Sequence, residues 1–147
     1  MPSSTSSERP ASPLRVAIIG YGLAGSVFHA PLIASTDGMT VSAIVTSNAE
    51  RQQHARADFP NATILASAEH IWQDAANYDL LVIASPNRAH VPLGITAMQA
   101  GLPVVIDKPV APSVADAERL IAASRSTGKL LTVFQNRRWD NDFLTVR

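Results

Sequence analysis

The sequence predicts an α/β domain built on a doubly wound parallel sheet. Short apolar runs rich in Val and Ile alternate along the chain with Ala-rich amphipathic stretches, and only a few residues separate one from the next. Runs that are apolar almost throughout are typical of strands buried on both faces between layers of helices. The length of 147 residues and the apolar fraction of 46% suffice for one globular domain with a sizeable core.

Six apolar runs are expected to form the strands of this sheet. The weakest is the segment 62–65, and the strong runs are 14–20, 41–46, 80–85, 102–107 and 130–135. Strand and helix alternate regularly, which is the pattern of a sheet with right-handed crossovers.

The intervals between the strands are expected to form helices. Pro31 should kink or shorten the first helix, because proline has no N–H to donate inside a helix. In the last helix, Ser113 and Asp116 form a capping-box pattern and Gly128 provides a stop. The helices are predicted from within 22–26 to about 35, after Asn48, after Ser67, over 89–100 and over 113–128.

The two ends of the chain differ from the domain between them. Residues 1–13 are rich in Ser and Pro and poor in apolar side chains, which predicts a disordered tail. Residues 14–136 form the predicted domain. Residues 137–147 are interpreted as the start of a truncated C-terminal domain, with Asp140 and Asp142 near the N-terminus of a further helix.

Composition excludes several classes of partner. Twelve basic and twelve acidic residues give a net charge of zero, and Arg137-Arg138 is the only adjacent basic pair, so no nucleic acid is expected to bind. The chain has no Cys and four scattered His, which argues against a metal site. No apolar run approaches the ~20 residues that span a bilayer, so a soluble cytoplasmic protein without a membrane partner is expected.

A glycine pattern follows the first predicted strand. Gly20, Gly22 and Gly25 form G-x-G-x-x-G between a strand and a helix, the context in which this motif binds a dinucleotide in a Rossmann domain. Gly20 permits the tight turn, Gly22 lets backbone amides approach a diphosphate, and Gly25 allows close helix packing. Leu23 and Ala24 complete the predicted cofactor-binding loop.

The end of the second predicted strand favours NADP over NAD. NAD-binding domains place a carboxylate here for the ribose 2′-hydroxyl. This chain instead has Ser47, Asn48 and Arg51, whose hydroxyl, amide and guanidinium groups suit a 2′-phosphate. Glu50, inside the following helix, keeps NAD open as an alternative.

Two further strand ends carry polar groups that would face the same crevice. Lys108 is one of two lysines among twelve basic residues, and it is a candidate acid/base group or ligand of a substrate hydroxyl. Pro109 would hold the turn, with a cis bond as one option. For His90, binding and a packing or capping role are equally open. The candidates that follow the two strands are Ser85, Pro86, Asn87 and His90, and Asp107, Lys108 and Pro109.

The remaining notable side chains are expected to be structural. His29, His54 and His70 lie in helical stretches, and Trp72 and Tyr78 are expected to pack in the core.

Four motifs in this order and spacing resemble the N-terminal half of the Gfo/Idh/MocA oxidoreductases, and most closely the branch related to scyllo-inositol dehydrogenases. The resemblance covers residues 14–147. The motifs are G-Y-G-L-A-G-S-V-F-H-A-P-L-I at 20–33, S-P-N-R-A-H at 85–90, V-V-I-D-K-P at 104–109 and F-Q-N-R-R-W-D at 134–140.

The resemblance implies hydride transfer between a nicotinamide cofactor and a secondary hydroxyl of a sugar, inositol or related polyol. It implies that Lys108 acts in catalysis and substrate binding, and Asp107 stands where the family usually has Glu. The residues that it implies near the dinucleotide are Ser85, Pro86, Asn87, His90, Asp107 and Gln135; those implied near the substrate are Lys108, Asn136, Arg137 and Trp139.

Family members are more than twice as long as this chain, and their second α/β domain supplies the other catalytic residues and the oligomer interface. We therefore expect the chain to bind cofactor with little turnover, and to form a homo-oligomer only with that domain present. The alternative is a regulatory module that binds a dinucleotide without catalysis, but such a module does not require Lys108.

Overall fold

Six parallel strands form one sheet in the order β3-β2-β1-β4-β5-β6. The structure is a computed structural model, and it describes residues 12–146. The predicted fold class is confirmed, and the order reverses at β1, from which the chain runs first to one edge and then to the other. The strands are β1 (Leu14–Ile19), β2 (Met39–Val45), β3 (Thr63–Leu65), β4 (Leu80–Ile83), β5 (Val104–Ile106) and β6 (Leu131–Val133).

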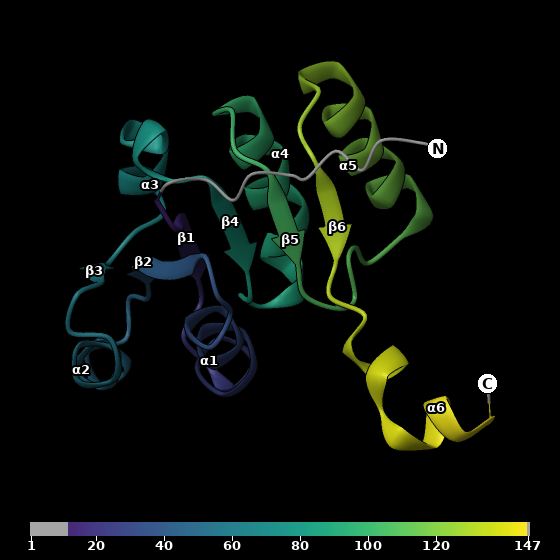
Figure 1. The fold of residues 1–147 in the computed structure, drawn as a ribbon. Helices are drawn as coiled ribbons and strands as arrows, with labels where there is room; N and C mark the ends of the chain where they lie inside the picture. The colour runs from purple at the N-terminus through teal and green to yellow at the C-terminus, as the bar shows by residue number, and fades with distance from the viewer. Residues whose placement is uncertain (1–11, 147) are drawn as a thin grey trace, which may run out of the picture.

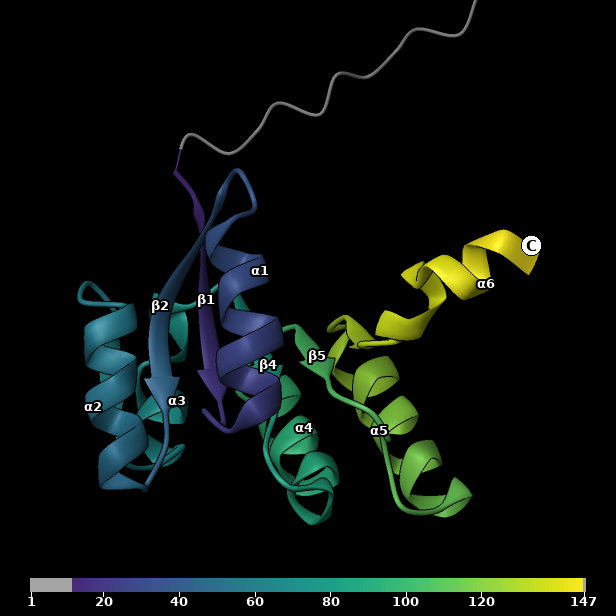
Figure 2. The same cartoon turned by 90° about the horizontal axis from the view of Figure 1, so that it is seen from below.

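Helices cover both faces of this sheet. Figure 1 shows α1 and α2 below the strands and α3, α4 and α5 above them, and in Figure 2 the C-terminal α6 extends away from the sheet. The helices are α1 (Ala30–Ala34), α2 (Ala49–Asp58), α3 (Glu69–Gln73), α4 (His90–Gln99), α5 (Val114–Thr127) and α6 (Asn141–Val146). Single 3-10 turns span Ala75–Asn77, Asn87–Ala89 and Asn136–Trp139.

The core consists of two apolar layers, one on each side of the sheet. Alternate residues of β1 enter opposite layers, since successive strand side chains point to opposite faces: Val16 and Ile18 pack with α1 and α2, and Ala17 and Ile19 with α3, α4 and α5. Trp72 and Tyr78 pack against the second layer, as predicted.

The expectation that every strand is buried on both faces is wrong for β6. Thr132 is exposed and Val105, its neighbour in the β5-β6 register, is only half-buried. Both lie on the face that α1 and α2 cover elsewhere, and no helix of the described residues covers it here. An edge strand that lacks one helix layer buries one face only.

Sequence patterns placed the helix ends correctly. The Ser113 hydroxyl accepts a hydrogen bond from the Asp116 N–H at 3.1 Å, and Gly128 ends α5 at a φ of 68°. The Asn48 side chain likewise accepts from the Arg51 N–H at 2.9 Å and caps α2.

The first helix has a form that the sequence did not predict. Its first six residues, Ala24–His29, are a π-helical turn, in which the Ala30 N–H donates to the Gly25 carbonyl. Pro31 follows directly and has no N–H to donate. The chain therefore holds one extra residue per turn between the glycine loop and Pro31, and this rotates the side chains that follow the loop.

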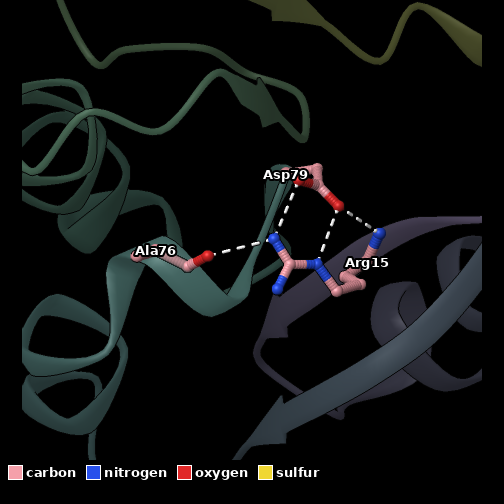
Figure 3. A network of polar contacts seen from close by, with 3 residues as sticks. All are labelled: Arg15, Ala76 and Asp79. Carbon is pink, nitrogen blue, oxygen red and sulfur yellow. Dashed lines mark hydrogen bonds and ion pairs between the residues drawn. The ribbon is translucent and has the colours of Figure 1, made fainter. Parts of the chain in front are cut away.

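An ion pair joins the start of β1 to the segment before β4, at the amino ends of these two central strands and so at the opposite end of the strands from the glycine loop. The Arg15 guanidinium donates to both carboxylate oxygens of Asp79 at 3.0 Å and to the Ala76 carbonyl, and the Arg15 N–H donates to Asp79 (Figure 3). These hydrogen bonds lower the pKa of Asp79.

No helix of the described residues is long and apolar enough to cross a membrane. The predicted tail, residues 1–13, lies outside the described part of the chain apart from residues 12 and 13.

Candidate functional site

The glycine loop lies between β1 and the π-helical turn and packs tightly against the end of β4. Gly20 has a φ of 101°, and a Cβ added there would lie 2.5 Å from the Ala84 carbonyl oxygen. A Cβ added at Gly25 would overlap the Gly20 carbonyl oxygen. Both positions therefore require glycine for the fold itself.

Gly22 differs from the other two glycines of the motif, because no backbone atom beyond its chain neighbours would lie close to a Cβ added at this position. The nearest atom to a Cβ added there is a guanidinium nitrogen of Arg51, at 3.6 Å. Packing therefore leaves room for a side chain at Gly22, and the open space in front of its backbone is the place where a ligand could approach the loop.

Two cavities lie at the carboxyl ends of the strands, one on each side of the loop. The first, the β2-side cavity, has a volume of about 420 Å³ and lies at the ends of β1, β2 and β4. It brings together five of the predicted residues with the Glu69 carboxylate of α3. The predicted residues are Gly20, Ser47, Arg51, Ser85 and Pro86.

The second, the β6-side cavity, has a volume of about 270 Å³ and lies between the π-helical turn and the ends of β5 and β6. Lys108 and Arg137 contribute its cations and Asp107 its carboxylate. Its lining contains six predicted residues and three that were not predicted. The first group is Leu23, Ala24, Asp107, Lys108, Asn136 and Arg137, and the second is Phe28, His29 and Phe134.

Among residues 12–146, the side-chain atoms that are buried without a hydrogen-bond partner are Ser85 Oγ, His29 Nε2 and Asn136 Oδ1. Ser85 lines the β2-side cavity, and the other two line the β6-side cavity. Buried polar groups in proteins are nearly always hydrogen-bonded, so these three atoms, gathered at two cavities, are available to bond to a polar ligand or to water.

The loop after β5 presents Lys108 to the β6-side cavity. The Asp107 carboxylate accepts from the Lys108 N–H at 2.9 Å, which bends the chain just before Lys108. The Lys108-Pro109 peptide bond is cis, one of the two options for this turn.

His90 is 1% exposed and holds this loop to the end of β4. Its Nδ1 lies 2.8 Å from the Pro109 carbonyl oxygen, and its Nε2 lies 2.8 Å from that of Ser85. Both ring nitrogens thus face backbone oxygens, as expected if His90 packs within the fold. A contact between His90 and the dinucleotide stays a prediction.

Other predicted site residues lie outside the two cavities. The oxygen of Asn48 is engaged in capping α2, and Asn87 begins a 3-10 turn. Gln135 and Trp139 line a hollow on the uncovered face beside Val105, and Trp139 is 68% exposed. These four remain predictions, and the fold does not bring Trp139 to the lining that contains Lys108.

Sequence reasoning missed His29, which was expected to be structural only. The ring is 4% exposed, it lies against Phe134 with ring centroids 4.3 Å apart, and its Nε2 is 3.8 Å from Asp107 Oδ1. One signal was available: His29 stands four residues after Gly25, on the helix whose N-terminus faces the site. Burial lowers the pKa of His29, and the nearby Asp107 acts in the opposite direction.

Tyr21, inside the glycine motif, lines the β2-side cavity and fastens the loop to α2. Its hydroxyl donates to Asp58 at 2.7 Å, and its ring meets Phe59 edge-on. Burial and this bond raise the pKa of Tyr21, so the phenol stays protonated at neutral pH.

No group of three or more His, Asp or Glu within the described range could hold a metal ion.

Comparison of the sequence with known proteins finds a family and individual relatives. Residues 14–135 match the model of the oxidoreductase family with an NAD-binding Rossmann fold, GFO_IDH_MocA. The chain is 44% identical over 134 residues to the oxidoreductase YdgJ of Escherichia coli and 40% identical over 139 residues to scyllo-inositol 2-dehydrogenase (NADP(+)) IolW of Bacillus subtilis. These alignments cover 91% and 95% of this chain and 38% of each relative.

A solved dehydrogenase structure has a fold similar to that of this chain. The WlbA dehydrogenase of Bordetella pertussis, in complex with NADH and UDP-GlcNAcA, superimposes with a TM-score of 0.83 at 29% identity, over 91% of this chain and 40% of that one. The chain thus spans about two fifths of the length of its relatives. The match over residues 14–135 shows that this chain belongs to the Gfo/Idh/MocA oxidoreductase family and contains its NAD-binding Rossmann domain.

Proposed function

We propose that the chain is the cofactor-binding part of an NADP-preferring oxidoreductase that transfers a hydride between nicotinamide and a secondary hydroxyl of an inositol, sugar or related polyol. The observation that carries this proposal is the gathering of the unpartnered buried atoms of Ser85, His29 and Asn136 at two cavities that flank the glycine loop. A dinucleotide has its two nucleosides on either side of a diphosphate, just as the two cavities lie on either side of the glycine loop.

The diphosphate would lie against the backbone of Gly22, where packing leaves space and the Arg51 guanidinium is near. The adenosine half would occupy the β2-side cavity and the nicotinamide half the β6-side cavity. The bound nicotinamide supplies or accepts the hydride.

Lys108 would act on the reacting hydroxyl. It is the lysine of the β6-side cavity, and its ammonium can donate a hydrogen bond to a substrate oxygen or exchange a proton with it. Asn136 and Arg137, in the same lining, would bind further polar groups of the substrate. A polyol fits this set of donors, and the name of IolW specifies scyllo-inositol.

The NADP preference rests on Arg51 and Ser47, which would bind the 2′-phosphate in the β2-side cavity. The Glu69 carboxylate in the same lining would repel a phosphate. IolW is named for NADP(+), and WlbA was solved with NADH, so relatives differ in this respect.

Catalysis would need a second domain, which begins in our interpretation at residue 137 and provides the surface for homo-oligomers. Apolar side chains exposed after β6 would become buried within such a domain; they are Trp139, Phe143, Leu144 and Val146. We propose a cytoplasmic location for the complete enzyme.

Titration of the chain with NADPH and NADH, followed by nicotinamide fluorescence, tests the proposal. We expect both to bind and NADPH to bind more tightly. A preference for NADH would contradict the role of Ser47 and Arg51, and absence of binding by either would refute the proposed function.

A further inference from the structure

His29 lines the β6-side cavity, and the proposed function assigns no ligand atom to its ring. The side chain is 96% buried, since its exposed fraction is 4%, yet its Nε2 has no hydrogen-bond partner among residues 12–146. A buried donor or acceptor without a partner costs stability, and a group bound in the cavity would supply the missing hydrogen bond.

Two features hold the ring in this position. The π-helical turn Ala24–His29 has one more residue per turn than an α-helix and directs His29 toward the ends of β5 and β6. Phe134, directly after β6, lies against the ring at a centroid distance of 4.3 Å and an interplanar angle of 50°. The ring is therefore enclosed by the helix on one side and by Phe134 on another.

The polar group nearest to Nε2 is the Asp107 carboxylate. The distance from Nε2 to Oδ1 is 3.8 Å, which is too long for a direct hydrogen bond. Oδ1 accepts one bond from the Lys108 N–H and has a second lone pair free. The two atoms thus face each other across a gap at the cavity lining.

The protonation of the ring follows from its surroundings. Burial lowers the pKa of His29 below its ordinary value of 6.5, so the ring is mostly neutral at pH 7 and carries one N–H. The neighbouring Asp107 carboxylate favours the tautomer with the proton on Nε2, because a bare ring nitrogen would repel it. Nε2 is then a donor and Oδ1 an acceptor.

We propose that His29 Nε2 and Asp107 Oδ1 together bind a single hydroxyl group of the ligand, His29 donating to the hydroxyl oxygen and Asp107 accepting its proton. One oxygen can lie within ordinary hydrogen-bond distance of two atoms that are 3.8 Å apart, and a hydroxyl is the group that both accepts and donates. This inference rests on the proposed function, because it takes the cavity to be the nicotinamide side of a dinucleotide site.

The hydroxyl could belong to the nicotinamide ribose or to the polyol substrate, and the same chemistry recognises both. Three ligands separate these sources: ADP has the diphosphate and no second ribose, ADP-ribose adds that ribose, and scyllo-inositol supplies the polyol. Where NADPH binds better than NADH, the 2′-phosphorylated forms of ADP and ADP-ribose replace them.

The first experiment measures binding of these ligands to the wild-type chain and to His29→Phe by calorimetry. Phenylalanine keeps a ring against Phe134 and removes the donor. His29→Gln keeps a donor amide and serves as the rescue variant, and His54→Phe on the exposed face of α2 is the matched control.

If the ribose provides the hydroxyl, His29→Phe should weaken ADP-ribose and the dinucleotide ~10-fold, the size of one hydrogen bond to a polar group, and leave ADP unchanged. If the polyol provides it, the nucleotides should be unaffected and scyllo-inositol should bind more weakly to the nucleotide-loaded variant. Either result supports the proposal. An equal loss for ADP, or no loss for any ligand, overturns it.

A second experiment changes the ligand instead of the protein, so its result on the wild-type chain does not depend on the folding of a variant. If the ribose provides the hydroxyl, consider dinucleotides in which the 2′- or the 3′-hydroxyl of the nicotinamide ribose is replaced by hydrogen. One of the two should bind the wild-type chain ~10-fold more weakly than the parent dinucleotide does, and should bind His29→Phe no more weakly than the parent does. Additive losses in both cases, together with unchanged inositol binding, would contradict the shared hydroxyl. If the wild-type chain binds neither dinucleotide nor ADP, the proposed function itself fails and this inference with it.

Discussion

The imidazole of His90 lies 2.8 Å from the carbonyl oxygen of Pro109, and this contact joins the start of α4 to the loop that carries Lys108. The other ring nitrogen lies equally close to the Ser85 carbonyl oxygen at the end of β4. Whichever tautomer the ring adopts, an N–H donates to one of these oxygens. His90 thereby ties together the strand ends that line the two cavities.

Replacing His90 by Ala should lower the free energy of unfolding by about 2–4 kcal/mol, because it leaves a buried carbonyl oxygen without a donor and opens a cavity. Urea denaturation followed by circular dichroism measures this change. His54→Ala, the same substitution at an exposed position of α2, is the control and should have little effect. Equal stability of the two variants would show that the His90 contacts contribute nothing.

The glycines of the loop should respond differently to alanine. Gly25→Ala should prevent the native packing, because the new Cβ would overlap the Gly20 carbonyl oxygen. Gly22→Ala should leave the melting temperature nearly unchanged and weaken dinucleotide binding ~10-fold or more, because its Cβ would enter the space proposed for the diphosphate. Thermal unfolding and fluorescence titration of both variants test this, and unaltered binding by Gly22→Ala would argue that the ligand lies elsewhere.

Arg51→Ala should reduce affinity for NADPH ~10-fold or more, since a charge-assisted hydrogen bond to the 2′-phosphate is lost, and leave affinity for NADH within a factor of about two. Arg56→Ala, on the same helix and outside the cavity, is the matched control. A parallel loss for both cofactors would place Arg51 at the diphosphate instead.

In a protein that includes the second domain, Lys108→Ala should lower turnover ~100-fold or more, the usual scale for a positioned acid/base group. Lys129 is the other lysine of the chain and lies outside both cavities, so Lys129→Ala should retain full activity. Steady-state kinetics with NADPH and inositol substrates decide the matter, and a fully active Lys108→Ala enzyme would refute the role given to Lys108.

The Arg15-Asp79 pair predicts a pH dependence of stability. The folded-state pKa of Asp79 is below the ordinary value of 3.8. The ion pair therefore contributes fully to the free energy of unfolding above pH 3.8, and this contribution is lost as the pH falls through the folded-state pKa. Asp79→Asn should therefore be less stable than the wild type at pH 6, with a smaller difference at pH 2.5, by urea denaturation at each pH. The contribution is modest because both side chains are partly exposed. The exposed Asp37→Asn variant is the control, and a pH-independent difference for Asp79→Asn would contradict this account.

Much of the fold was predictable because its signals are local. Ser113 with Asp116 and Gly128 marks the two ends of α5, and the six apolar runs coincide with the six strands within two residues at each end. The glycine motif likewise predicted the loop at the end of β1, where Gly20 has the positive φ that favours glycine.

The sequence by itself determined the succession of strands and helices, the glycine loop and the family, since hydrophobic periodicity, capping residues and motif spacing are properties of neighbouring residues. Only the tertiary structure decided that His29 enters the β6-side cavity, that His90 bonds to Ser85 and Pro109, and that the face containing Thr132 is uncovered. Each of these depends on how segments distant in the chain meet: the π-helical turn against Phe134, α4 against the loop after β5, and an edge strand that has α5 on one face and no helix of the described residues on the other.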